Sequence, residues 1–62
     1  MMAKILAHPA VRELDYEGKE DGYWCYLNPG YVDTESGCTS IHEWTLKDVW
    51  GKLDYVEKEA AK

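Results

Sequence analysis

The sequence lacks phenylalanine, has only two prolines and two cysteines, and contains no long hydrophobic run. No apolar segment approaches the ~20 residues of a membrane-spanning helix, so we expect no contact with a membrane. The apolar patch at the N-terminus is too short for a signal peptide, which predicts a cytoplasmic protein. In that compartment two cysteines are normally free thiols.

Positive charge is also scarce: seven Lys and Arg stand against twelve Asp and Glu, for a net charge of −5. This balance would repel a phosphate backbone, so we expect no nucleic-acid binding. The acidic residues are spread along the chain, which favours a role in solubility. The alternative is an acidic face that docks on a basic partner and imitates nucleic acid.

The length of 62 residues predicts one small domain, 1–62, with frayed ends at residues 1–3 and 59–62. Such a chain buries only about 60% of its unfolded surface, so every large side chain matters to its stability. In the absence of Phe, three Trp and five Tyr are expected to supply much of the packing. Each can bury about 150–250 Å² but keeps one polar atom that needs a partner.

Three segments have the pattern of β-strands: residues 11–16, 23–27 and 38–42. The second of these, YWCYL, is apolar on both faces, which is typical of a central strand covered by a helix on one side. A polar loop with two glycines joins the first two segments and predicts a hairpin. Residues 38–42 are expected to return antiparallel along the second strand.

The hairpin has a predicted register in which Tyr16 lies opposite Tyr23 and Leu14 lies opposite Cys25. This register puts Leu14, Tyr16, Tyr23, Cys25 and Leu27 on one face of the sheet. Trp24 and Tyr26 then point to the reverse face, because side chains alternate along a strand.

Two proline-containing segments divide the chain further. Pro9 disfavours helical geometry at His8, so a new segment begins near Ala10, while residues 2–7 fit either a helical turn or a strand. The sequence Asn28-Pro29-Gly30 predicts a tight turn, because Pro presets φ at the second position and Gly accepts positive φ at the third. A short strand is expected to resume after it.

The C-terminal part has the clearest pattern, an amphipathic helix over residues 46–58. Thr45 followed by Asp48 resembles a capping box. The apolar stripe of the helix consists of Leu46, Val49, Trp50, Leu53 and Val56. Gly51 interrupts good helix formers and is interpreted as a point of close approach to the sheet. The predicted fold class is α+β, a three-stranded antiparallel sheet with this helix packed on one face.

Three short motifs resemble those of small, uncharacterised proteins from tailed bacteriophages and prophages. They are the His-Pro-Ala-Val of residues 8–11, the Gly-Tyr-Trp of 22–24 with the Leu-Asn-Pro-Gly-Tyr of 27–31, and the Ile-His-Glu-Trp-Thr-Leu of 41–46. This chain departs from the family at Trp44, where an acidic residue is usual. The resemblance implies a phage accessory protein in the bacterial cytoplasm, and it carries over no catalytic residue.

Four side chains could act as soft metal ligands: Cys25, Cys38, His42 and His8. The spacing of Cys38 and His42 suits zinc on one helical turn, but in a strand about 13 Å would separate their Cα atoms. We therefore expect no metal and no other cofactor, and keep a small metal- or ligand-binding domain using Cys25, Cys38 and His42 as the alternative function. A Cys25–Cys38 disulfide is a further alternative.

No arrangement typical of an enzyme is present, and we expect this protein not to be one. His42 and Glu43 are neighbours on a predicted strand and so point to opposite faces. His42 is expected instead to form a hydrogen bond at the junction between strand and helix. Asp33, Glu35 and Ser36 are interpreted as loop-forming residues.

The aromatic residues outnumber what one small interface between helix and sheet would hide. The simplest interpretation puts all of them in the core, where Trp50 and either Trp24 or the opposite face of its strand are expected. The alternative is that some are exposed anchors for a protein partner, since Trp and Tyr are enriched at binding hot spots. The candidates are Trp24, Tyr26, Tyr31, Trp44 and Tyr55. The sequence thus predicts a phage-type accessory protein that binds a host protein or forms a homodimer.

Overall fold

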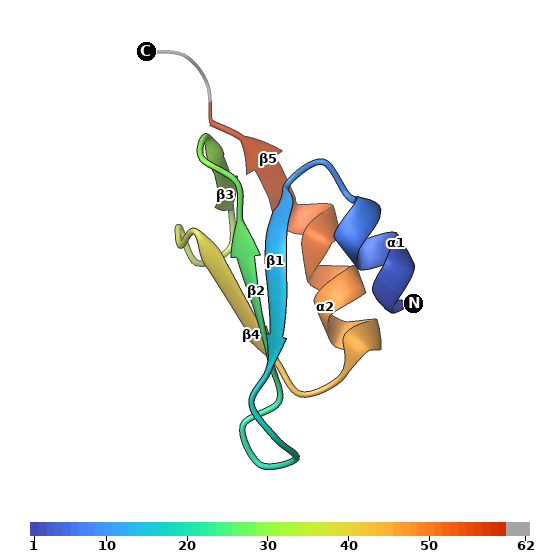
Figure 1. The fold of residues 1–62 in the computed structure, drawn as a ribbon. Coiled ribbons are helices and arrows are strands. Elements are labelled where there is room, and N and C mark those ends of the chain that lie inside the picture. Colours follow the sequence, from blue (N-terminus) through green and yellow to red (C-terminus); the bar gives the residue numbers. More distant parts are fainter. Residues whose placement is uncertain (60–62) are drawn as a thin grey trace.

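The computed structural model describes residues 1–59, which form a sheet with two helices on one of its faces (Figure 1). The elements follow the chain as α1 (Met2–Ala7), β1 (Val11–Tyr16), β2 (Tyr23–Leu27), β3 (Tyr31–Asp33), β4 (Ser40–Glu43), α2 (Leu46–Lys52), the 3-10 helix η1 (Leu53–Tyr55) and β5 (Val56–Lys58). The predicted α+β class is confirmed. Of the predicted frayed ends, residues 60–62 lie outside the described part, and residues 2 and 3 belong to α1.

The main sheet has the strand order β1-β2-β4, with both pairs antiparallel. Its register confirms the predicted hairpin, with Leu14 opposite Cys25 and Tyr16 opposite Tyr23. The third strand covers Ser40–Glu43 rather than residues 38–42. It starts later because the Cys38 carbonyl accepts a hydrogen bond from Asp33 N, at 2.9 Å, and thereby belongs to the preceding loop.

A second, two-stranded sheet of β3 and β5 corrects the predicted helix. The helix expected over 46–58 ends at Lys52 and is followed by η1 and then by β5. The chain changes direction because β5 pairs antiparallel with β3, placing Val56 opposite Asp33. Thr34 N also donates to Tyr55 O at 2.9 Å, which fixes the end of the helical segment against the strand. This pairing joins segments far apart in the sequence, and helix propensity alone cannot indicate it.

The predicted helix cap at Thr45 and the predicted turn at Asn28-Pro29-Gly30 are both confirmed. Asp48 N donates to Thr45 Oγ1 at 3.1 Å, so Thr45 is the N-cap of α2. Tyr31 N donates to Asn28 O at 3.1 Å and Gly30 has a φ of 92°, as expected for the Asn28-Pro29-Gly30 turn.

The N-terminal segment, for which helix and strand were both open, is the helix α1. Its Ile5 is fully buried. His8 is extended, as a residue before proline prefers, and ends the helix. Val11 N then donates to His8 O at 3.0 Å, which turns the chain directly into β1.

The buried hydrophobic core contains no aromatic side chain, so Trp and Tyr supply less of the packing than expected: Tyr23 and Tyr31 pack against the core, and no Trp does. In the described chain it consists of Ile5, Ala10, Val11, Cys25, Leu27, Ile41, Val49 and Leu53. Short helices leave little depth above the sheet, and these compact side chains fill it. Trp50, expected in the core, is 37% exposed and lies edge-on to the His8 ring at 6.3 Å. Gly51 is exposed with open space around it, so it marks no close approach to the sheet.

Candidate functional site

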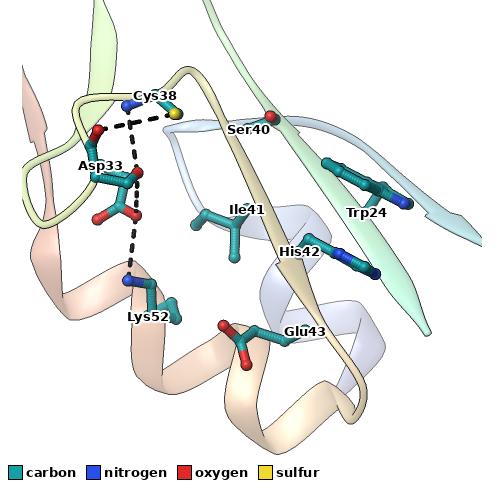
Figure 2. A pocket seen from close by; sticks show the side chains of 9 residues that line it. Trp24, Asp33, Cys38, Ser40, Ile41, His42, Glu43 and Lys52 are labelled. Carbon is teal, nitrogen blue, oxygen red and sulfur yellow. Dashed lines mark hydrogen bonds and ion pairs between the residues drawn. The ribbon is translucent and has the colours of Figure 1, made fainter. Parts of the chain in front are cut away.

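A row of rings lies on the face of the main sheet opposite to α1 and α2. We call Tyr26, Trp24, His42 and Trp44 the aromatic row. Along β2 and β4, the alternate residues Cys25 and Ile41 point into the core, so Trp24 and His42 point to the other face. Trp24 and His42 are direct cross-strand partners, so their rings are neighbours on this face (Figure 2).

The rings of the aromatic row contact one another in sequence across the sheet. The Trp24 and His42 ring centroids are 4.2 Å apart with an interplanar angle of 6°. His42 also lies 4.4 Å from Trp44, and Trp24 lies 6.4 Å from Tyr26. Such contacts stabilise ring pairs by about 0.5–1.5 kcal/mol beyond simple burial. The row therefore has a fixed geometry even though Trp44 is 55% exposed.

The β1–β2 hairpin loop fixes one end of this row. Trp44 Nε1 donates to Glu20 O at 2.9 Å, and His42 Nε2 donates to Asp21 O. Gly22 makes this arrangement possible, since a Cβ there would lie 2.5 Å from Glu43 O and its φ is +73°. The loop can thus lie against the end of β4 only with glycine at this position.

The other side of the row, along β1, carries acidic side chains. Asp15 is the cross-strand partner of Trp24, and Glu13 is the partner of Tyr26. The Arg12 guanidinium lies 5.9 Å from the centre of the Tyr26 ring, within the range of a cation–π contact. Arg12 Nη2 also lies 3.7 Å from Glu13 Oε1. The Arg12 guanidinium thus lies near both an aromatic ring and a carboxylate.

A hollow of about 270 Å³ lies beside β4, one of the two edge strands of the main sheet (Figure 2). Its lining residues are Trp24, Asp33, Ser36, Cys38, Ser40, Ile41, His42, Glu43 and Lys52. The buried Asp33 accepts hydrogen bonds from Glu35 N at 3.1 Å and Ser36 Oγ at 2.9 Å. These bonds confirm that Glu35 and Ser36 shape a loop with Asp33, although Asp33 is itself the last residue of β3.

Lys52 completes the environment of Asp33 from α2. Its Nζ lies 3.2 Å from Asp33 Oδ2 and 2.6 Å from Glu35 Oε1. Burial alone would raise the pKa of Asp33, but the bonds from Ser36 Oγ and Glu35 N and the Lys52 ammonium together hold that pKa below its ordinary value. The hydrogen bond to Glu35 and then the contacts with Asp33 raise the pKa of Lys52. The ion pairs of Lys52 with Asp33 and Glu35 thus connect α2 to β3 and to the loop that follows β3.

The structure brings together three of the five predicted interface residues: Trp24, Tyr26 and Trp44. Tyr31 lies apart on β3, partly buried against the core, and Tyr55 lies on η1 with its ring 5.8 Å from Lys52 Nζ. Sequence reasoning missed His42 as a member of the row. The signal was present in the alternation of rings at i and i+2 on both sides, Trp24 with Tyr26 and His42 with Trp44.

The structure does not bring Cys25, Cys38 and His42 together. Cys25 is buried on the helix-covered face, His42 is on the opposite face, and Cys38 is exposed in the loop before β4. Both cysteines are free, so no bridge joins them. Burial raises the pKa of the Cys25 thiol to about 11. Within residues 1–59, no three His, Cys, Asp or Glu side chains gather in the way that a metal ion requires.

Comparison with known proteins identifies no relative: neither a family model, nor a curated protein, nor a solved structure matches this chain. Among residues 1–59 there is no helix of the length and apolar character needed to cross a membrane.

Proposed function

We propose that this chain is a small module that binds a protein partner through its aromatic row. The observation that carries the proposal is that the large rings are stacked on an uncovered sheet face while the core is built without them. A chain of 62 residues has little apolar surface to spare for folding. Rigid rings that lie outside such a core are well suited to bind a partner.

Rigid aromatic side chains are effective anchors in protein interfaces. Trp and Tyr are enriched at hot spots because they bury a large area at a small cost in side-chain entropy. In the aromatic row, stacking and the bonds to the hairpin loop already restrict the rings of His42 and Trp44. A partner would therefore meet a preformed surface, which lowers the entropic cost of binding.

The proposed setting is that of a phage-type accessory protein in the bacterial cytoplasm. Support for this part comes from the resemblance carried by residues 8–11, 22–24, 27–31 and 41–46. The partner would then be a host protein, or a second copy of the same chain that pairs through the sheet face.

A capture experiment with two matched variants tests the binding proposal. Trp44→Ala removes an exposed ring of the aromatic row, and Trp50→Ala removes an exposed ring on the helical side of the molecule. We expect the wild type and Trp50→Ala to retain a stoichiometric partner from bacterial lysate, and Trp44→Ala to lose it. Light scattering after gel filtration shows whether that partner is a second copy. If Trp44→Ala and the wild type bind the same proteins equally and share one oligomeric state, the proposal is wrong.

A further inference from the structure

We infer that the aromatic row receives an arginine side chain of its partner, held between the Trp24 indole and the Asp15 carboxylate. This inference rests on the proposed function and specifies its chemistry. It follows from three features of the row: a free ring face, a carboxylate beside it, and an internal arginine that occupies the equivalent position one step along the sheet.

The first feature is the orientation of the Trp24 indole. His42 stands on β4 and covers one face of this ring, with near-parallel planes and centroids 4.2 Å apart. Because the two rings are stacked across neighbouring strands, the second indole face is turned away from β4 and toward β1. Tyr26 is also near-parallel to the indole, at 6.4 Å and 16°, but this distance is about the spacing of alternate residues in a strand, so its ring is displaced along β2 rather than toward β1. Among the described residues, no cation lies over the Trp24 ring.

The second feature is the carboxylate on the β1 side. Asp15 is the direct cross-strand partner of Trp24, so its side chain stands on the same sheet face and beside the free side of the indole. Within the described chain Asp15 takes part in no ion pair, and its exposed side chain is open to an incoming cation. An indole face and a carboxylate at neighbouring positions both attract positive charge.

The third feature is Arg12, which provides an example, within this chain, of a guanidinium near a ring and a carboxylate. Arg12 places its guanidinium over Tyr26 and beside Glu13, and Glu13 is the cross-strand partner of Tyr26. The pair Asp15 and Trp24 repeats this combination at the next position on the same face, without a cation of its own. The chain therefore fills one of two adjacent sites of the same type and leaves the other open.

The chemistry favours arginine over lysine and over an uncharged side chain. A planar guanidinium can stack on the indole while it donates two hydrogen bonds to the carboxylate, which a lysine ammonium cannot do. The net charge of −5 attracts a basic segment as well. The occupant is thus an arginine on an exposed segment of the partner protein.

Two nine-residue peptides of glycine and serine test the inference, one with a central arginine and one with the uncharged isostere citrulline. Each is titrated into the full-length protein, and the indole N–H signals of the tryptophans are followed by NMR. We expect the arginine peptide to shift the Trp24 signal, and the citrulline peptide to bind at least about fivefold more weakly, which corresponds to about 1 kcal/mol.

Asp15→Asn is the test variant, and Asp54→Asn is its control. Both remove one negative charge from an exposed side chain, but Asp54 lies on η1. We expect Asp15→Asn to weaken arginine-peptide binding about fivefold and Asp54→Asn to change it by less than about twofold.

The outcomes separate this inference from the proposed function. Equal binding of the arginine and citrulline peptides at Trp24 would overturn the arginine site while supporting the row as a protein-binding surface. The same holds if Asp15→Asn and Asp54→Asn weaken binding equally. The absence of any shift at Trp24 with either peptide also overturns the inference, and the capture experiment with Trp44→Ala still decides the proposed function independently.

Discussion

Asp33 offers the sharpest test of how this small fold is stabilised. Its side chain is 2% exposed, and its two oxygens accept from Glu35 N, Ser36 Oγ and Lys52 Nζ. Replacement by Asn keeps the shape and one acceptor oxygen but places an amide where the anion meets the Lys52 ammonium. The variant Asp33→Asn therefore removes the charge and leaves the packing almost unchanged.

The expected loss follows from the bonds that need an anion. A hydrogen bond to a charged group contributes about 1.5–3 kcal/mol, and the weaker bond to Glu35 N survives in the variant. We expect Asp33→Asn to lower the free energy of unfolding by about 2 kcal/mol at pH 7. That is a large fraction of the total, which for 62 residues is about 3–9 kcal/mol.

The stability that the Asp33 carboxylate contributes depends on pH, because the carboxylate titrates. The pKa of Asp33 is lowered in the folded state, so its contribution to stability is fully present above the unfolded pKa of about 3.9 and is lost as pH falls through the folded pKa. Asn does not titrate. The difference in unfolding free energy between wild type and Asp33→Asn is therefore expected to be constant from pH 7 to pH 5 and to shrink below about pH 4.

Urea unfolding followed by tryptophan fluorescence at several pH values measures this difference. The control is Glu35→Gln, which removes only the ion pair between Lys52 and the half-exposed Glu35. An exposed pair of this kind contributes about 0–1 kcal/mol, so the control should lose much less than Asp33→Asn. Equal losses in both variants, or an Asp33→Asn difference that is independent of pH, would contradict the stabilising role of the Asp33 charge.

Three further predictions concern glycines and thiols. In urea titrations, Gly22→Ala should lower the unfolding free energy by at least about 1 kcal/mol more than Gly18→Ala. Both glycines have positive φ, but only Gly22 abuts the backbone at the end of β4, so equal losses would contradict this close approach. Gly51→Ala should raise the unfolding free energy by about 0.5–1 kcal/mol in the same assay, since its site is helical and open, and a loss would show that the residue has another role. In a thiol-reagent assay at pH 8, Cys38 should react at once and Cys25, buried with a pKa of about 11, only after unfolding; rapid reaction of both would refute its burial.

The parts of the fold that the sequence predicts are those determined by neighbouring residues. The hairpin register follows from alternation along two strands joined by a short loop, and the start of α2 follows from the Thr45 cap. The end of α2 could not be predicted in this way. Residues of β5 favour a helix locally, but their pairing with β3 depends on a distant segment, and that tertiary contact overrides propensity.

The candidate site was predicted in part, for a related reason. Trp24, Tyr26 and Trp44 were recognisable as interface candidates by residue type, whereas Tyr31 and Tyr55 have the same type and lie elsewhere. Only the pairing of β2 with β4 determines which rings meet. His42 joins the row because it is the cross-strand partner of Trp24, a relationship that composition does not reveal.

The alternation of side chains along β2 and β4 also separates stability from binding in this molecule. Cys25 and Ile41 are cross-strand partners that face the core, and Trp24 and His42 are the next pair and face outward. A substitution in the inner pair removes buried apolar contacts and so acts on the free energy of unfolding. A substitution in the outer pair alters a surface that the core does not need, because no ring of the aromatic row belongs to the buried cluster or packs against it. Since the two pairs are consecutive on the same strands, a loss of partner binding without a loss of stability would locate the function on the outer face.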